Sequence, residues 1–221
     1  MEFKDWEPLY LDILGDFGFS RERDEEAAYL LEALALRKPP CDDRCLSSII
    51  HEKVTVCGDA PNLPDHLNKC RAQGTVIAAD GATSALCARG IRPDIIVTDL
   101  DGDIDPQLKA NSAGSVAVIH AHGDNMPELG QYGPLFRGRV VMTTQSSPFR
   151  QVRNYGGFTD GDRAVVLARH FGAQQIFLLG FDFLHPKPKK GKDPEVKLRK
   201  LAWARRIIFD QNPRQVSLWI P

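Results

Sequence analysis

The 221-residue sequence lacks the features that mark several large classes of protein. It has no apolar run of the ~20 residues that a membrane-spanning helix needs. Its start, MEFKDWEPLY, is acidic and aromatic, unlike a secretory signal. Lys and Arg total 28 against 29 for Asp and Glu, so no excess of positive charge favours nucleic acid. We therefore expect a cytoplasmic protein that binds neither nucleic acid nor membranes.

The cysteines lack the spacing of a disulfide framework or a zinc site. There are five, an odd number without a CxxC pair, which suits a reducing compartment. Cys41 and Cys45 can share one face of a helix, but no His or Cys follows at zinc-finger spacing. We predict that all five are buried or incidental thiols.

The common nucleotide-binding signatures are missing as well. No GxxxxGK(S/T) is present, which excludes a P-loop enzyme, and no GxGxxG follows an expected strand. An EF-hand loop that begins at Asp99 fails, because its sixth position is Ile104 instead of Gly and its twelfth is Ala110 instead of Glu. A nucleotide or metal site must therefore be built from other residues.

What the sequence does contain is an alternation of β-branched runs with helical patterns. Residues 22–37 have helical periodicity, which KPP ends. With the aromatic segment before them they predict an N-terminal helical extension over residues 1–50. Over residues 51–221, the expected catalytic core, most runs of strand length are apolar on both alternating positions, as in strands buried on both faces. We predict a single α/β domain over residues 1–221, with a Rossmann-like, mostly parallel sheet and helices on both of its faces. The expected strands are KVTVCG, TVIAADG, DIIVTDLDG, SVAVIHAHGD, RVVMTTQ, QIFLLGFDF and, at an edge, QVSLWI; the expected helices are 65–74, 83–90, 106–114, 160–173 and 193–212.

Four acids at alternate positions follow the third expected strand, in IIVTDLDGDID. In a parallel α/β sheet the ligand site lies beyond the carboxyl ends of the strands. Clustered carboxylates repel one another and are costly to bury, so they need a cation or contact with water. Asp99 and Asp101 leave the strand end on the same side, and hard oxygen ligands at that spacing suit Mg²⁺. For Asp103 and Asp105 we favour a solvated turn that caps the next helix.

Polar residues also lie near the ends of the neighbouring strands. Asp80 and Asp94 come from adjoining segments that we expect on the same rim, which is the edge formed by the carboxyl ends of the strands. Their position there supports the magnesium interpretation. The backbone amides of CGDAPN, which contains Gly58 and Asn62, are candidates for a phosphate cradle.

The motif HAHGDN, residues 120–125, admits three interpretations. His-x-His-x-Asp is similar to the zinc motif of metallo-β-lactamases, but Asn125 stands where that motif needs another His. The histidines can instead be hydrogen-bonded at a strand end, or they can recognise a polar substrate beside the magnesium. We favour the last of these.

Two later segments each have a structural and a functional interpretation. In GGFTDGDRAV, residues 156–165, Thr159, Asp160 and Asp162 precede a helix; they suit an N-cap, and a helix N-terminus also binds phosphate. The Lys-rich segment that contains Lys189 and Lys190 is either a solvated loop or a mobile lid that binds phosphate.

These motifs resemble two related families of kinases. ADGATSALCARGIRPDIIVTDLDGD resembles the DGA…L…GI.PD…GDxDS region of thiamine pyrophosphokinases. EFKDWEPLY, VCGDAPNL, HAHGDN, GFTDGDRAV and LGFDF are similar, in the same order and over nearly the whole chain, to the archaeal 6-hydroxymethyl-7,8-dihydropterin pyrophosphokinases. The resemblance implies Mg²⁺-dependent transfer of diphosphate from ATP to the hydroxymethyl oxygen of the pterin, with release of AMP. It implies a step in tetrahydromethanopterin or folate-type pterin biosynthesis.

The resemblance and the rim together assign roles to individual residues. We expect the metal ligands to be Asp80, Asp99 and Asp101. The residues that contact ATP are expected to be Gly58, Asn62, Asp80, Gly81, Asp94, Lys189 and Lys190. The residues that contact the pterin are expected to be His120, Asn125, Thr159, Asp160 and Asp162. If the reaction needs a base, Asp124 or His122 is the better candidate, which makes Asp99, Asp101, Asp124 and His122 the expected catalytic set.

Three alternatives remain open at this point. Thiamine is the less favoured acceptor, because this chain lacks the acids before the Thr-Asp pair and the C-terminal β-sandwich of thiamine enzymes. Asp-Leu-Asp is also a DxD pattern of nucleotide-sugar glycosyltransferases, and the same rim could serve a non-catalytic nucleotide sensor. The sequence is compatible with a homo-oligomer without specifying one.

Overall fold

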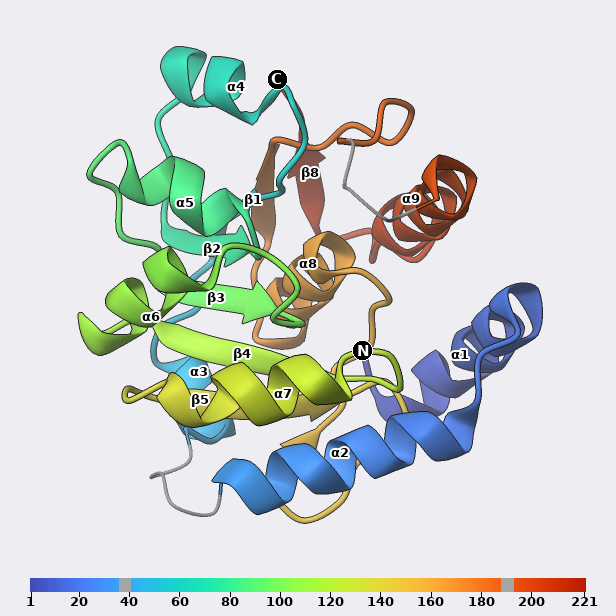
Figure 1. Cartoon of the computed structure of the whole chain (residues 1–221). Coiled ribbons are helices and arrows are strands. Elements are labelled where there is room, and N and C mark those ends of the chain that lie inside the picture. The colour runs from blue at the N-terminus through green and yellow to red at the C-terminus, as the bar shows by residue number, and fades with distance from the viewer. Residues whose placement is uncertain (36–40, 188–192) are drawn as a thin grey trace.

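The computed structural model describes residues 1–35, 41–187 and 193–221, and a parallel sheet organises these residues (Figure 1). Its eight strands run in the order β6-β5-β4-β3-β2-β1-β7-β8, and every neighbouring pair is parallel. This confirms the predicted α/β fold. The strands are β1 (Lys53–Cys57), β2 (Thr75–Ala79), β3 (Ile95–Thr98), β4 (Val116–Ala121), β5 (Val140–Thr144), β6 (Val152–Arg153), β7 (Gln175–Leu179) and β8 (Ser217–Trp219).

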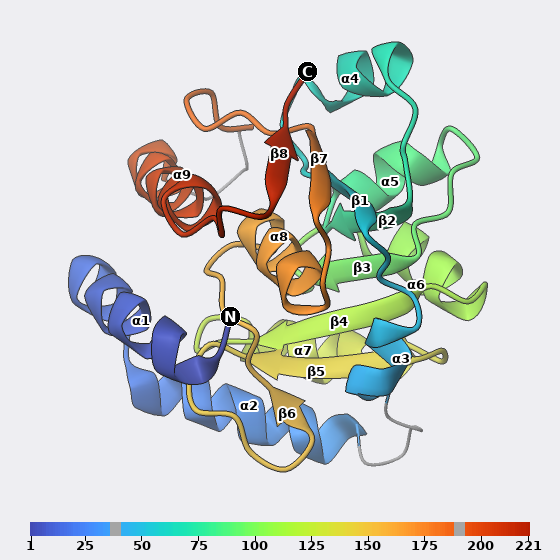
Figure 2. The same ribbon diagram turned by 180° about the vertical axis from the view of Figure 1, so that it is seen from behind.

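Helices cover both faces of the sheet. Every residue of β2, β3, β4 and β5 is buried, which explains why these strands read as continuous apolar runs. Figure 1 looks onto the face covered by α2, α5, α6 and α7, and Figure 2 onto the face covered by α8. The helices are α1 (Phe3–Phe17), α2 (Arg21–Ala35), α3 (Asp43–Ser47), α4 (Leu63–Lys69), α5 (Ala82–Cys87), α6 (Ile104–Ser112), α7 (Met126–Tyr132), α8 (Asp160–His170) and α9 (Pro194–Phe209), with a 3₁₀ turn at Gly133–Leu135.

The first two helices pack on the sheet domain at two different depths. Ala27 and Leu31 of α2 pack directly against β4 and β5. Trp6 and Tyr10 of α1 instead pack in an outer layer with Val166 of α8 and with α9. The turn between α1 and α2 is thereby held near the carboxyl ends of β4 and β5 (Figure 2).

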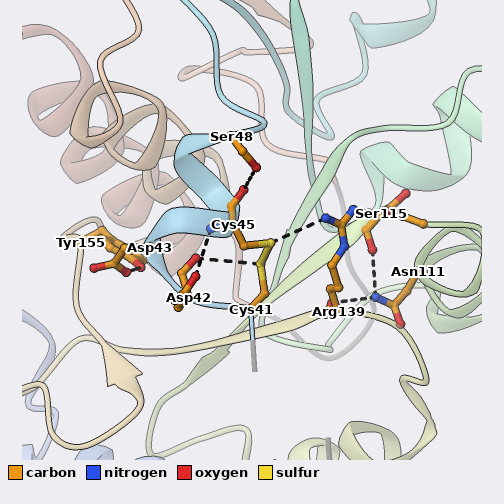
Figure 3. The surroundings of a disulfide bond; sticks show 10 residues. Cys41, Asp42, Asp43, Cys45, Ser48, Asn111, Ser115, Arg139 and Tyr155 are labelled. Carbon is orange, nitrogen blue, oxygen red and sulfur yellow. Dashed lines mark hydrogen bonds between the residues drawn. A yellow bond between two sulfur atoms is a disulfide. The ribbon is translucent and has the colours of Figure 1, made fainter. Parts of the chain in front are cut away.

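Cys41 and Cys45 form a disulfide, so the prediction that all five cysteines are thiols is wrong for this pair (Figure 3). Asp42 lies at the N-cap of α3, where its side chain accepts a hydrogen bond from the Cys45 backbone N–H at 3.1 Å. This first turn brings the two Cα atoms to 5.6 Å, within the range a disulfide requires. The sequence spacing placed both residues on one helix face but did not show that the turn would be this tight.

The other three cysteines, Cys57, Cys70 and Cys87, are free thiols as predicted. Burial raises the pKa of Cys57 to about 12, so this thiol is chemically inert at neutral pH. None of the helices in the described ranges is both long enough and apolar enough to cross a membrane.

Candidate active site

A cavity of about 570 Å³ opens beyond the carboxyl ends of the central strands. Its wall follows the order of the sheet: the loops after β7 and β1 at one end, the loops after β2 and β3 in the middle, and the loops after β4 and β5 at the other end. The α1–α2 turn, the start of α8 and the first half of α9 complete the wall. This is the edge at which parallel sheets bind ligands, as the sequence predicts.

Three carboxylates converge in the middle of this wall. Asp80 follows β2, Asp99 follows β3, and Asp160 is the first residue of α8. One oxygen or more from each lies within 4.8 Å of the others. Asp101, the fourth acid of interest, also lines the cavity, and its backbone N–H donates to Asp99 Oδ1 at 3.2 Å. The structure therefore brings Asp80 and Asp99 together as expected, places Asp101 in the same wall but outside this group of three, and adds Asp160, which the sequence assigned to the substrate.

Asp80 is held in an unusual position by the surrounding chain. Its backbone φ is +41°, a conformation that Asp tolerates better than most residues. Its Oδ1 accepts hydrogen bonds from Thr98 Oγ1 and Gln107 Nε2, both at 2.9 Å. Gly102 approaches so closely that a Cβ at this position would overlap the Asp80 carboxylate. Burial, together with the charges of neighbouring acids, raises the pKa of Asp80 to about 6.

The Asp99–Asp101 segment turns sharply at Leu100. Leu100 has a φ of +68°, in the left-handed region that a leucine rarely adopts. Its side chain is 1 % exposed and is anchored in the core on the α2 side of the sheet. The Leu100 backbone N–H donates to Thr98 Oγ1 at 2.9 Å. Strain of this kind persists only where the surrounding structure imposes it, and here it fixes the direction in which the two aspartates leave the strand.

His122 lies against Asp99 and is oriented by its own loop. Its Nδ1 accepts a hydrogen bond from the Asp124 backbone N–H at 3.3 Å. We therefore assign the proton of the neutral ring to Nε2, which lies 3.4 Å from Asp99 Oδ2 and donates to it. Burial alone would raise the pKa of Asp99, but His122 and then Arg163 hold it well below its usual range. Because both ring nitrogens are engaged, His122 is better suited to position Asp99 than to accept a proton.

The start of α8 combines a helix cap with a charged pair. Asp162 accepts hydrogen bonds from the Phe158 backbone N–H and from the backbone and hydroxyl groups of Thr159, which completes a capping box. Asp160 instead faces the cavity and pairs with Arg163 at 3.2 Å. Burial and the neighbouring Asp99 raise the pKa of Asp160 well above its usual value. Asp162 therefore fulfils the structural interpretation of this motif, as part of the helix cap, and Asp160 is the residue to which the functional interpretation applies.

At the other end of the wall, the loop after β1 lies against the loop after β7. The backbones are so close that a Cβ at Gly58 would lie 2.6 Å from the carbonyl oxygen of Gly180. Asn62 is turned away from the cavity, since its Nδ2 donates to the carbonyl oxygen of Phe181 at 3.0 Å. Gly81 does not line the cavity either, but its lack of a Cβ leaves room for the Asp59 carboxylate.

Asp94 does not join the acids, which corrects the expectation that it lies on the same rim. It precedes β3, whereas Asp99 follows that strand. Four strand residues span ~13 Å, so Asp94 lies at the opposite edge of the sheet. There its Oδ2 accepts a hydrogen bond from the Val76 backbone N–H at 2.8 Å.

His120 and Asn125 are also kept from the cavity. His120 is 2 % exposed, and its Nδ1 bonds the Thr143 hydroxyl at 3.0 Å. Asn125 Nδ2 donates to the carbonyl oxygens of Asp99 and His120, both at 2.7 Å, and so ties the ends of β3 and β4 together. Within the described ranges the acid-rich metal group contains neither histidine of HAHGDN, so the geometry gives no support to the zinc interpretation.

The remaining expectations fall in three groups. Thr159 and Asp124 line the cavity as expected. Asp103 and Asp105 are exposed, as the solvated interpretation predicts. Asp103 stands at the N-cap position of α6, but its side chain does not cap the helix and instead accepts a hydrogen bond from Ser84 Oγ at 3.2 Å. Lys189 and Lys190 lie outside the described residues.

Several cavity residues were missed by the sequence analysis. Arg163 stands inside a quoted motif but was not assigned a role, and its position one helical turn after Asp160 was the signal that could have revealed it. Asp24 and Gln145 come from segments that the sequence pattern treats only as a covering helix and a strand end. Lys200 of α9 lies in the cavity wall with its ammonium 5.5 Å from the ring centroids of both Phe19 and Phe158. Other missed residues that line the cavity include Arg23, Asp59, Phe158, Phe181, Phe183 and Lys187.

Comparison with known proteins gives one consistent result. Residues 35–187 match a family model described as 6-hydroxymethylpterin diphosphokinase MptE-like. The chain is 45 % identical over 223 residues to a 6-hydroxymethyl-7,8-dihydropterin pyrophosphokinase of Methanothermobacter thermautotrophicus, an alignment that covers 94 % of each chain. It is 44 % identical to a protein of that name from Pyrococcus furiosus, over 94 % of this chain and 93 % of the relative. For a third, from Methanocaldococcus jannaschii, the identity is 35 % over 94 % and 95 % of the two chains.

Proposed function

Because the chain belongs to the MptE-like family of 6-hydroxymethylpterin diphosphokinases, we propose that it transfers diphosphate from ATP to 6-hydroxymethyl-7,8-dihydropterin. In this reaction the hydroxymethyl oxygen forms a bond to the β-phosphorus, the bond from that phosphorus to the α–β bridging oxygen breaks, and AMP leaves. The observation that carries the proposal is the convergence of Asp80, Asp99 and Asp160 in a cavity of about 570 Å³, in a member of this family.

The acids suit Mg²⁺. Carboxylate oxygens are the protein ligands that Mg²⁺ uses most, and oxygens bound to one such ion at ~2.1 Å lie up to ~4.2 Å apart. Asp80, Asp99 and Asp160 offer oxygens within 4.8 Å of one another, so a small movement would bring them around one ion. Asp101 is close enough in the chain to act with them. When bound, Mg²⁺ offsets negative charge on the phosphates and orients them.

Basic side chains supply the other charges that a triphosphate needs. Arg163 is 7 % exposed and contacts both Asp160 and Gln145. Burial lowers the pKa of Lys200, and Arg163 lowers it further, so an anion beside Lys200 would stabilise its charged form. Phosphoryl transfer depends mainly on positioning and on such charge stabilisation.

The acceptor alcohol needs little help from a base. In a loose transition state the oxygen loses its proton late, so alignment contributes more than deprotonation. Asp124 is exposed at the cavity wall and is the residue we assign to take this proton. His122 holds Asp99 in place. We further propose that the enzyme works in the cytoplasm and that its product enters a tetrahydromethanopterin or folate-type pathway.

An assay of nucleotide products tests the proposal. With saturating Mg²⁺-ATP, we expect AMP release that depends on 6-hydroxymethyl-7,8-dihydropterin and is far slower with an equal concentration of thiamine. ADP as the sole nucleotide product would contradict diphosphoryl transfer, and faster turnover of thiamine would contradict the choice of acceptor. Consumption of a nucleotide sugar would favour a glycosyltransferase, and nucleotide binding without turnover would favour a sensor.

A further inference from the structure

The cavity has an aromatic wall at each end, with the acids between them. Phe181 and Phe183, after β7, have ring centroids 6.0 Å apart. Phe19, from the α1–α2 turn, and Phe158, before α8, have centroids 6.4 Å apart. The sheet order places the β7 and β1 loops on one side of the acid-bearing β2 and β3 loops, and the β4 and β5 loops on the other. The proposed reaction brings two flat heterocycles, adenine and pterin, to one cavity.

The end of the cavity at β4 and β5 contains a buried carboxylate. Asp24 of α2 is 3 % exposed and lines the cavity. Its Oδ1 accepts a hydrogen bond from the Gly123 backbone N–H at 2.8 Å. Its Oδ2 accepts one from the Tyr10 hydroxyl at 2.7 Å and one from Gln145 Nε2 at 2.8 Å. All three donors are neutral.

These contacts leave part of the accepting capacity of Asp24 unused. A carboxylate has about four lone-pair sites, and these donors occupy three of them. The donors come from three different elements, which fix the group in one orientation. Its Oδ1 accepts from Gly123 alone among the described residues. A buried carboxylate with neutral donors is stabilised further by any additional N–H that a ligand brings.

The two heterocycles differ in what they offer to such a group. The pyrimidinone edge of a pterin presents an amino group and a ring N–H side by side, and both are donors. The corresponding edge of adenine presents one amino group flanked by ring nitrogens that accept. A carboxylate can only accept, so it attracts the pterin edge and repels the lone pairs of adenine.

We propose that the pterin ring lies at the β4–β5 end of the cavity, with its amino edge on Asp24 and its face toward Phe19 and Phe158. The adenosine of ATP then lies at the β1–β7 end, beside Phe181. This assignment deepens the proposed function and rests on it. It makes Asp24 the residue that selects the acceptor, and it assigns to the N-terminal helices a role in specificity. It also replaces the sequence-based expectation that Asn125 and Asp160 read the pterin edge.

Equilibrium binding measured without turnover tests the assignment. The probe is 6-hydroxymethylpterin, followed by its own fluorescence, with Mg²⁺-ATP binding measured separately by calorimetry. We expect Asp24→Asn to weaken pterin binding on the order of 10- to 100-fold and to change ATP binding less than ~2-fold. Glu32→Gln is the matched control, because Glu32 is a buried acid of the same helix that pairs with Arg150 away from the cavity. It should leave both affinities unchanged.

A second pair of variants keeps the assignment testable if Asp24→Asn fails to fold. Phe19→Ala should weaken pterin binding more than ATP binding, and Phe181→Ala should do the reverse. Wild-type pterin affinity in a folded Asp24→Asn variant, or the opposite pattern in the two Phe variants, would overturn the assignment. Failure of the proposed function is a different result: the wild-type protein would then release no AMP with the dihydropterin, whatever the variants bind.

Discussion

The two edges of the sheet use similar polar side chains in opposite ways. At the amino edge Asp94 and Asn111 find their partners in the backbone: Asp94 accepts from Val76, and Asn111 donates to the carbonyl oxygens of Ser115 and Arg139 (Figure 3). At the carboxyl edge, Asp80, Asp99 and Asp160 face one another instead. The first arrangement stabilises the fold. The second leaves carboxylates whose mutual repulsion an added cation would relieve.

The largest effect should follow from a change at the carboxyl edge. We expect Asp99→Asn to lower kcat/KM on the order of 1,000-fold or more, because it removes charge that binds Mg²⁺ and thereby orients the phosphates. The increase in melting temperature that Mg²⁺ causes in the wild-type protein should disappear in this variant. Asp105→Asn, at an exposed acid of the same motif, is the control and should retain turnover. Loss of activity in both variants would contradict the assignment of Asp99 to the metal site and of Asp105 to a solvated turn.

A smaller effect should follow from filling the space beside Asp80. In Gly102→Ala the new methyl group would overlap the Asp80 carboxylate and displace it, so we expect kcat/KM to fall by about 10- to 100-fold. Gly130→Ala makes the same change in α7, where nothing lies within 4 Å of the added Cβ. Steady-state kinetics of the two variants measure the difference. Equal values of kcat/KM in the two variants would mean that catalysis does not depend on the exact position of the Asp80 carboxylate.

Strand patterns predict the fold well because they depend on local sequence. Buried parallel strands must be apolar on both faces, and the runs in β2 to β5 satisfy this requirement without reference to anything distant. The acids Asp80 and Asp99 could be located for the same reason, since both follow such runs directly. Asp94 was misplaced although it stands before the same run, because the prediction overlooked that a residue preceding a parallel strand lies at the amino edge.

The rest of the site depends on contacts that local sequence does not encode. Asp24 reaches the cavity only because α2 docks on β4 and β5, and Gln145 meets it from 121 residues further along the chain. Lys200 enters the wall from α9 in the same way. His122 was one of two candidate bases in the sequence, but its hydrogen bonds to Asp99 and Asp124 fix both ring nitrogens.

The smallest effect on turnover should come from the amino edge. Asn111 is 1 % exposed, and its Oδ1 also accepts from the Gly138 backbone N–H at 2.7 Å. We expect Asn111→Ala to lower the free energy of unfolding by about 2 kcal/mol, because buried backbone groups lose their partners. Turnover per folded molecule should stay close to wild type. Denaturant unfolding and active-site titration measure the two quantities, with the exposed Asn68→Ala as the control. A selective loss of kcat would show that the two edges are coupled.

The docking of α1 and α2 has a consequence for synthesis on the ribosome. Trp6 bonds the carbonyl oxygen of Gln145, 139 residues later, and Asp16 pairs with Arg199, 183 residues later. At ~5–20 residues per second, α9 is made on the order of 10–40 s after α1. During that interval the apolar face of α1, which packs with α9 in the folded protein, is open to chaperones or to other chains. Of the described helices and strands, α1 is made first but is among the last to reach its final place, and the cavity is completed only then.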